Sequence, residues 1–171
     1  MNRKKGIIIA LILAILGIGT YFYIRSTYFF SPIFFKTDSI TYLPFYEYKR
    51  PMTYQYYSYK NNKVKGDIKD GEDDISFIYD ELKKSKIIGP GVIIDSKKYN
   101  IPDEYIGELS IWSSIGKERG MVNNITWYGS KTNICKVTAM YKLSQQSTAC
   151  DLYIEVTKPL SEFLKSKIGD V

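Results

Sequence analysis

The longest apolar run of the chain lies close to its first residue. The stretch "GIIIALILAILGIGTYFYI", residues 6–24, holds nineteen residues without a charge, between "NRKK" and Arg25. As a helix with about 1.5 Å of rise per residue it covers roughly 28 Å, which nearly matches a hydrocarbon core of about 30 Å. It lacks the polar stripe of a helix that packs on a soluble core. We therefore expect this segment to enter a membrane.

Two fates of this segment stay open, an uncleaved anchor and a signal peptide that is removed after export. Gly17 and Gly19 supply the small residues of a cleavage site. The apolar run nevertheless continues through residues 21–24, which are typical of the aromatic belt at a membrane interface, so we favour the anchor. Basic residues at positions 3–5, against Arg25 alone on the other side, predict a single-pass protein with a cytoplasmic N-terminus.

This interpretation divides the chain into three parts. Residues 1–25 are the cytoplasmic basic flank and transmembrane anchor, residues 26–40 a juxtamembrane segment, and residues 41–171 an extracytoplasmic domain. Pro32 ends any helix that continues from the membrane. The phenylalanines around it either rest on lipid headgroups or pack beneath the folded domain, and the sequence leaves both readings open. They are Phe29, Phe30, Phe34 and Phe35.

Two segments of the domain have the apolar period of a helix. After "DGEDD", residues 70–74, apolar side chains recur at i, i+3, i+4 and i+7, which is one helical face. We expect Asp73 or Asp74 to cap this helix, and the Gly-Pro-Gly of residues 89–91 to stop it. "KPLSEFLKSKIG" predicts a second helix with Pro159 at its first position. The first apolar face consists of Ile75, Ile78, Tyr79 and Leu82.

The other segments alternate as strands do. A tyrosine-rich strand at residues 52–60 is joined to "KVKGDIK", residues 63–69, by a turn at Asn61 and Asn62. Four further strands predict an antiparallel meander: "EYIGELSIW", "MVNNITWY", "ICKVTAMYKL" and "ACDLYIEV". The predicted fold class is α+β, a single N-terminal transmembrane helix followed by one small domain with an antiparallel sheet and two packing helices.

The first two strands of the meander fix a register. Pairing Leu109 with Ile125 places the large ring of Trp127 over Gly107, which is a favourable cross-strand pair. Strict alternation also puts Tyr105 on the same face as Gly107 and Leu109. That face is expected to meet the helices.

Aromatic side chains are the candidate binding residues. Residues 41–60 hold seven of the sixteen tyrosines, and tyrosine combines a large contact area with a hydroxyl group. On the strand at 52–60, alternation puts Tyr57 and Tyr59 on the face that we expect to point outward. Trp112, on the face of its strand away from the apolar residues, is the third candidate. The alternative is that these rings belong to an aromatic sheet core.

Charge and composition exclude several functions. The net charge is +6, but four of the 24 basic residues precede residue 26, so residues 26–171 carry 20 basic and 18 acidic residues. These charges are interspersed, which excludes nucleic-acid binding. The absence of histidine excludes Ser-His-Asp and Cys-His sites and the usual zinc ligands. "DGEDD" does not match the calcium-loop pattern. We therefore predict no catalytic residues, no metal and no cofactor.

Cys135 and Cys150 lie on the last two predicted strands. Export and an even count favour a disulfide. A tight turn at "SQQS", however, pairs Cys150 with Tyr141 or Leu143 and separates the two thiols by roughly 20–26 Å, whereas a disulfide needs Cα atoms within about 7 Å. We therefore expect two separate thiols and no disulfide. A turn moved back to residues 141–144 would instead pair the two cysteines directly.

These observations favour a membrane-anchored extracytoplasmic interaction domain without catalytic activity, whose partner is another protein. A short anchor on a chain rich in lysine, isoleucine and asparagine is typical of a bacterium. There we expect an inhibitor of, or an immunity protein against, an exported toxin or enzyme. Two alternatives stay open. One is a structural or assembly component of an envelope machine, such as a pilin-like subunit, and the other is a small envelope hydrolase that uses carboxylates.

Overall fold

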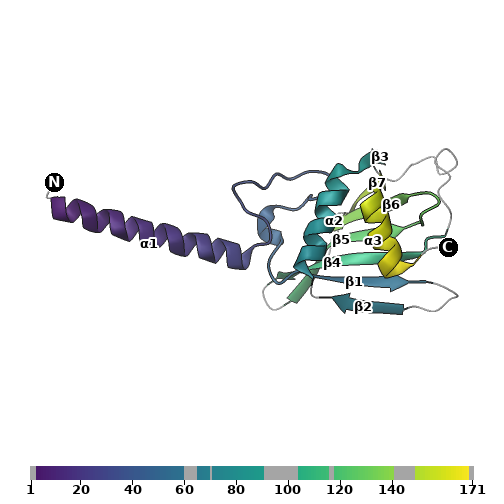
Figure 1. Ribbon diagram of the computed structural model, residues 1–171, viewed down its shortest axis with the longest axis horizontal. Helices are drawn as coiled ribbons and strands as arrows, with labels where there is room; N and C mark the ends of the chain where they lie inside the picture. Colours follow the sequence, from purple (N-terminus) through teal and green to yellow (C-terminus); the bar gives the residue numbers. More distant parts are fainter. Residues whose placement is uncertain are drawn as a thin grey trace.

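The computed structural model describes residues 3–59, 65–69, 71–90, 104–115, 118–140 and 149–169. It places a long helix, α1 (Arg3–Thr27), outside a domain in which two helices cover one face of a sheet (Figure 1). Within α1, Gly6–Thr27 is long and apolar enough to cross a membrane. The α+β fold with one candidate transmembrane helix is therefore confirmed.

In the described residues the sheet has seven strands, in the order β2-β1-β4-β5-β6-β7-β3, and every neighbouring pair is antiparallel. The predicted meander forms its centre, β4 to β7. The tyrosine-rich strand and its return form β1 and β2, although the turn predicted at Asn61 and Asn62 lies outside the described residues. The strands are β1 (Thr53–Ser58), β2 (Lys65–Lys69), β3 (Lys86–Pro90), β4 (Gly107–Ile115), β5 (Glu118–Trp127), β6 (Ile134–Met140) and β7 (Ala149–Glu155).

Two helices, α2 (Glu72–Lys84) and α3 (Lys158–Ile168), pack on the same face of the sheet (Figure 1). The apolar face predicted for α2 is buried in the core. The predicted cap was wrong, because Gly71 occupies the N-cap position and no side chain caps the helix. Asp74 instead accepts a hydrogen bond of 2.5 Å from the hydroxyl of Tyr54 and so ties α2 to β1.

The predicted stop of this helix at residues 89–91 was also wrong. The helix ends at Lys84, and Lys86–Pro90 forms the edge strand β3 on β7. Five residues that include a glycine and a proline show no alternation, so their extended geometry comes from pairing with β7. Proline is tolerated there because an edge strand leaves one row of N–H groups without a strand partner.

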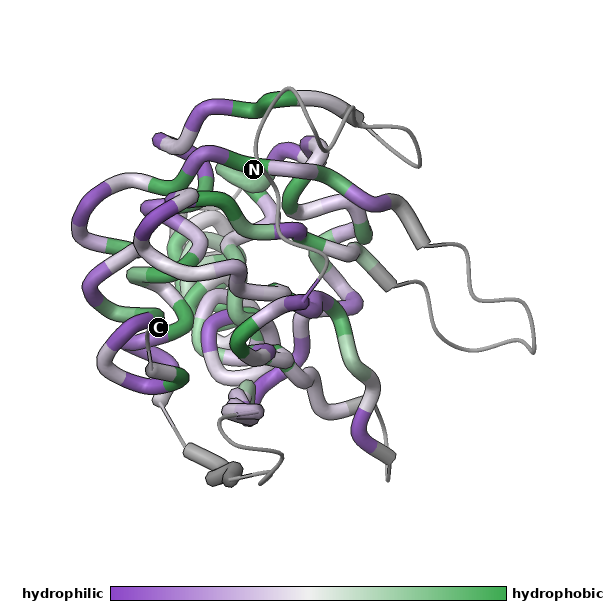
Figure 2. The backbone as a smooth tube through the Cα atoms, turned by 90° about the vertical axis from the view of Figure 1, so that its right-hand side faces the viewer, coloured by the Kyte–Doolittle hydropathy of each residue, from purple (hydrophilic) through white to green (hydrophobic). Residues whose placement is uncertain are grey.

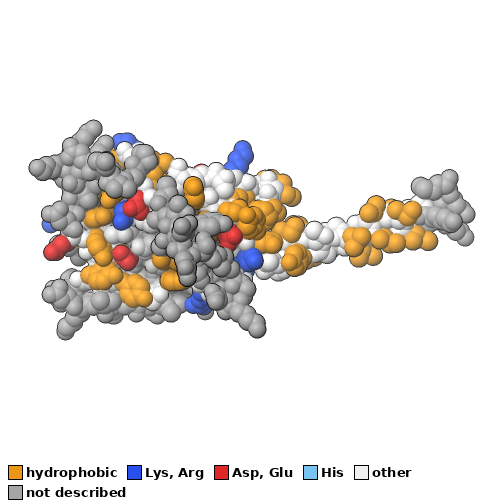
Figure 3. All heavy atoms as spheres, turned by 180° about the vertical axis from the view of Figure 1, so that it is seen from behind, with side chains coloured by type: hydrophobic (Ala, Val, Ile, Leu, Met, Phe, Trp, Pro, Cys, Tyr) orange, Lys and Arg blue, Asp and Glu red, His pale blue; other side chains and the backbone are white. Residues whose placement is uncertain are grey.

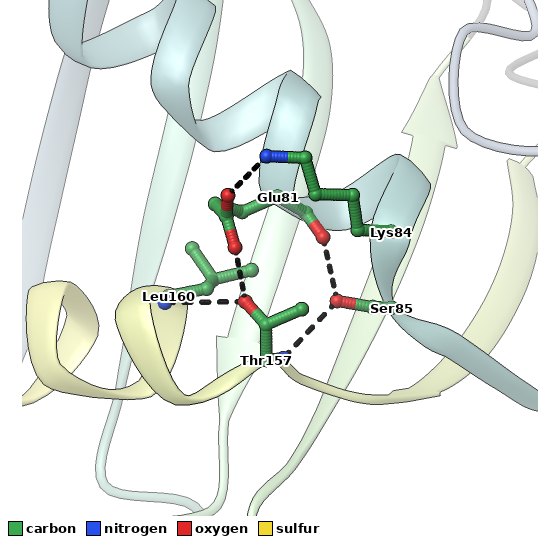
Figure 4. Close-up of polar contacts among 5 residues, drawn as sticks. All are labelled: Glu81, Lys84, Ser85, Thr157 and Leu160. Carbon is green, nitrogen blue, oxygen red and sulfur yellow. Dashed lines mark hydrogen bonds and ion pairs between the residues drawn. The ribbon is translucent and has the colours of Figure 1, made fainter.

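A network of hydrogen bonds holds the end of α2 against the start of α3 (Figure 4). The carboxylate of Glu81 accepts from Lys84 Nζ at 2.7 Å and from Thr157 Oγ1 at 2.5 Å. Ser85 Oγ donates to the carbonyl of Glu81 at 2.7 Å and accepts from the backbone N–H of Thr157 at 3.2 Å. Thr157 caps α3 through the N–H of Leu160. Glu81 is buried, and this network supplies its carboxylate with donors.

The predicted register of β4 and β5 is confirmed, with Leu109 opposite Ile125 and Gly107 opposite Trp127. The side chain nearest to Gly107 is nevertheless Ile168 of α3, whose Cγ2 would lie 2.4 Å from an added Cβ. Gly107 therefore has Trp127 as its cross-strand partner and α3 packed close to it. The missing side chain of Gly107 makes room for α3 to approach the sheet.

The register predicted for the cysteine hairpin was wrong. Cys135 pairs with Ile154, and Cys150 pairs with Ala139. The two cysteines are four residues apart along the hairpin, which is about 13 Å and beyond the reach of a disulfide. The thiol of Cys135 is free and buried, and burial raises its pKa. The predicted "SQQS" turn and the side chain of Cys150 lie outside the described residues.

Candidate interaction surface

The two faces of the sheet differ in what covers them. The helices pack on one face, and no helix among the described residues covers the other, which we call the open face (Figure 1). In Figure 2, which views the domain from the end opposite to α1, short hydrophobic and hydrophilic stretches follow one another along the chain. Cross-strand pairing puts polar side chains on the open face. One such row consists of Gln55, Ser110, Asn124, Thr138 and Asp151.

Tyrosines gather at one end of the open face. We call them the tyrosine row: Tyr57, Tyr59, Tyr105, Tyr128 and Tyr153. Figure 3 shows apolar and tyrosine side chains beside charged ones at this end, which is the end far from α1. The carbonyl of Thr27, where α1 ends, accepts from Arg50 N at 2.9 Å, and the carbonyl of the adjacent Lys49 accepts from Ser114 N at 3.2 Å. The C-terminal end of β4 therefore lies next to α1. The tyrosine row lies beside the opposite, N-terminal end of β4.

Strand register builds the tyrosine row. Tyr57 on β1 faces Glu108 on β4, which faces Thr126, and the same line continues through Lys136 to Tyr153 on β7. With about 4.8 Å between neighbouring strands, this line spans roughly 19 Å.

The rings contact one another in two pairs. Tyr59 and Tyr105 meet edge to face with ring centroids 5.4 Å apart. Tyr128 and Tyr153 stack with centroids 6.4 Å apart and an angle of 28° between the rings. The N–H of Ile106 donates to the carbonyl of Trp127 at 2.8 Å, so the adjacent residues Tyr105 and Tyr128 bring the two pairs close together. Contacts of this kind hold the rings in place without burying their outer surfaces.

Ionisation of two of these tyrosines, Tyr59 and Tyr128, is disfavoured. Burial, followed by the charge of Glu108 and the hydroxyl of Tyr105, raises the pKa of Tyr59. Burial and the neighbouring Tyr153 raise the pKa of Tyr128. The hydroxyls of Tyr59 and Tyr128 therefore stay protonated at neutral pH and are able both to donate and to accept hydrogen bonds. Beside them, Lys136 lies 3.8 Å from the carboxylate of Asp151.

The predicted site residues do not all come together. Tyr57 is half-buried and Tyr59 is exposed, and both belong to the tyrosine row. Trp112 is half-buried on the same face, but it pairs with Thr53. It stands four residues along β4 from Glu108, which is about 13 Å.

Trp112 belongs instead to a small hollow near the α1 end of the open face. The hollow has a volume of about 150 Å³ and is lined by Thr53, Gln55, Trp112 and Arg119. Trp112 Nε1 is buried and has no hydrogen-bond acceptor among the described residues. The side chain of Trp112 therefore lies in a different part of the open face from the tyrosine row.

Three members of the tyrosine row were not predicted from the sequence. Tyr128 and Tyr153 alternate with the buried Trp127 and Ile154, so their outward direction was readable from the pattern. Tyr105 was predicted on the inner face with Leu109 and is instead 41% exposed beside Tyr59. It precedes β4, so strand alternation does not govern it.

No family model, no curated protein and no solved structure matches this chain. Within the described part of the chain, no group of three or more cysteine, aspartate or glutamate side chains comes together in a way that could hold a metal ion. The tyrosine row therefore presents contact area, hydroxyl groups and a few paired charges.

Proposed function

We propose that this chain is a membrane-anchored binding domain without catalytic activity, which works outside the cytoplasm and contacts another protein through the tyrosine row. The observation that carries the proposal is the gathering of five tyrosines on the face of the sheet that the helices leave open. Tyrosine is enriched at protein interfaces because it adds a large, rigid contact area at low conformational cost.

The position of the tyrosine row supports this proposal. With α1 in a membrane and the basic residues at its start on the cytoplasmic side, the domain lies outside. The row then lies at the end of the domain farthest from the bilayer, where a protein partner has access to it. Its extent of roughly 19 Å across the strands suits a patch of protein surface.

Within this class we propose inhibition or immunity as the specific role, directed at an exported toxin or enzyme. A domain without catalytic groups acts by occupying a surface of its partner, and a rigid sheet face is suited to this. The anchor concentrates the domain where an exported or incoming protein passes the membrane.

Site-specific photo-crosslinking in native membranes tests the proposal. A photoreactive amino acid at Tyr59 or Tyr105 should give a discrete adduct with one partner protein. The same amino acid at Ser76, an exposed position on α2, is the matched control and should give none. Adducts from Ser76 alone would contradict the assignment of the surface, and adducts from no position would contradict the proposed partner.

The specific role needs a second measurement. If the captured partner is an enzyme or toxin, its activity should fall when it binds the wild-type chain. The Tyr59→Ala/Tyr105→Ala double variant should restore that activity. Full activity in the presence of the bound wild-type chain would contradict inhibition while leaving the binding function in place.

A further inference from the structure

The end of α1 is joined to the domain by a short, fixed connection. The N–H of Phe29 donates to the carbonyl of Tyr48 at 2.8 Å, and the N–H of Arg50 donates to the carbonyl of Thr27 at 2.9 Å. Arg50 Nε also donates to the carbonyl of Tyr28 at 3.2 Å, and its guanidinium pairs with Glu72. Because these bonds fix the chain on both sides of Tyr28, the segment after it has a defined position beside the helix.

The four phenylalanines of this segment divide into two groups. Phe29, Phe30 and Phe35 pack against the core, and Phe30 lies 5.0 Å from Tyr48 and 5.3 Å from Tyr79, measured between ring centroids. Phe34 is 83% exposed, as is its neighbour Ile33. Of the two readings that the sequence left open, packing beneath the domain is confirmed for Phe29, Phe30 and Phe35, and Phe34 does not share it.

A turn presents the two exposed residues. The carbonyl of Ser31 accepts from the N–H of Phe34 at 3.2 Å and from the N–H of Phe35 at 2.9 Å. This turn directs Phe35 into the core and leaves Ile33 and Phe34 at its tip, which we call the junction tip. Two adjacent large apolar side chains that are almost fully exposed to water are costly unless something apolar covers them.

The junction tip lies alongside the part of α1 expected in the membrane. A groove of about 540 Å³ between them is lined by Gly17, Thr20, Tyr21 and Ile24 of α1 and by the segment from Tyr28 to Phe34. Gly17 precedes the end of the helix by ten residues, which is about 15 Å along its axis. The tip therefore reaches back along the helix instead of away from it, and Figure 3 shows apolar side chains where α1 meets the domain.

We propose that the junction tip inserts into the same membrane leaflet as the last turns of α1, with lipid acyl chains filling the groove between them. This inference rests on the proposed membrane anchoring of α1. Arg25, at the end of α1, and the exposed Lys36 flank the tip with positive charge at the level of the lipid phosphates. Two points of insertion fix the tilt of the domain, which a single helix leaves free, and this keeps the tyrosine row away from the bilayer.

Depth-dependent fluorescence quenching tests this proposal. The full chain is placed in lipid nanodiscs with phosphatidylcholine whose acyl chains carry bromine, and tryptophan is introduced by Phe34→Trp. We expect the added fluorescence, above the wild-type signal of Trp112 and Trp127, to fall roughly twofold, because an inserted side chain contacts the brominated chains. Phe34 is exposed, so the substitution leaves the core intact.

Two control variants separate the possible outcomes. Leu13→Trp, in the middle of α1, reports whether the helix spans the bilayer and should be quenched. Ser166→Trp, an exposed position on α3 near the end that holds the tyrosine row, should keep its fluorescence. Quenching of Leu13→Trp without quenching of Phe34→Trp would overturn the inserted tip and leave the anchor in place. Quenching of neither would overturn the anchor, and the inserted tip with it.

Discussion

The two faces of the sheet are built by the same strands and differ in the side chains that they present. The covered face holds side chains that are almost fully buried, among them Leu109, Ile125 and Trp127. The open face holds hydroxyls, amides and charges, and its tyrosines contact one another in one edge-to-face pair and one stacked pair. Because alternate residues of one strand belong to the two faces, the core lies on one side, and the proposed binding surface lies on the other. This division predicts that substitutions one residue apart have very different effects.

The largest loss of stability is expected for Trp127→Ala on the covered face. The ring is fully buried, and removal of a buried tryptophan costs about 3–5 kcal/mol of unfolding free energy. Chemical denaturation of the full chain in detergent measures this loss. Trp127→Phe is the matched control, because it keeps an aromatic ring and removes an indole N–H that has no acceptor among the described residues. A loss below about 1 kcal/mol for Trp127→Ala would contradict the covered face as the main source of stability.

A smaller but substantial loss is expected for Gly107→Ala. The added Cβ would lie 2.1 Å from the carbonyl oxygen of Tyr57 and 2.4 Å from Ile168 Cγ2, so the strand and α3 must move apart. Overpacking of this kind costs about 1–3 kcal/mol. In the Gly107→Ala/Ile168→Ala double variant, the space left by Ile168 should absorb part of the strain. Its loss should therefore be smaller than the sum of the two single losses, and strict additivity would contradict this packing.

Alternation explains how much of the covered face was predictable. The pairing of Leu109 with Ile125 followed from keeping apolar residues on one side, because a slip by one residue moves every side chain to the wrong face. The same argument did not fix the hairpin of Cys135 and Cys150, since a slip by two residues preserves the faces. There the length of the turn decides the register, and alternation contains no information about it.

The tyrosine row was less predictable than the core for a different reason. The outward direction of Tyr57 and Tyr59 was predictable from alternation along their own strand. Their position on the same surface as Tyr128 and Tyr153, however, depends on the order of five strands. Tyr105 lies before the start of β4 and takes its position from contact with Tyr59. Strand order and contacts beyond a strand end are tertiary properties, which a local pattern does not encode.

Acid is expected to weaken the packing of the helices on the covered face. Hydrogen bonds from Lys84 and Thr157 lower the pKa of Glu81 in the folded chain. A lowered folded-state pKa contributes stability above the unfolded-state pKa of about 4.3, and this contribution is lost as the pH falls through the folded-state value. Glu81→Gln should therefore destabilise the chain at neutral pH and progressively less on acidification. The measurement is the difference in unfolding free energy between variant and wild type from pH 7 to pH 3.

Glu162 provides the control for this pH dependence. Its carboxylate lies on α3 at 3.9 Å from Lys158, and both side chains are exposed. Exposed ion pairs contribute little to stability, so Glu162→Gln should change the unfolding free energy little at any pH in this range. A difference for Glu81→Gln that stays constant between pH 7 and pH 3 would contradict a stabilising role of its ionised carboxylate.

The smallest change in stability is expected for Tyr59→Ala on the open face. Its ring is exposed and contacts Tyr105 only at the edge, so the unfolding free energy should change by no more than about 0.5 kcal/mol. Tyr57 and Trp112, which are half-buried, should fall between this value and that of Trp127 when each is replaced by alanine. Tyr54→Ala, on the same strand as Tyr59 but directed into the core, is the matched control and should lose several kcal/mol.

Tyr59→Ala should nevertheless weaken crosslinking from Tyr105 to the partner, because it removes a neighbouring ring of the tyrosine row. A stability loss as large as that of Tyr54→Ala would show that the open face is part of the core, and the proposed separation of stability from binding would then fail.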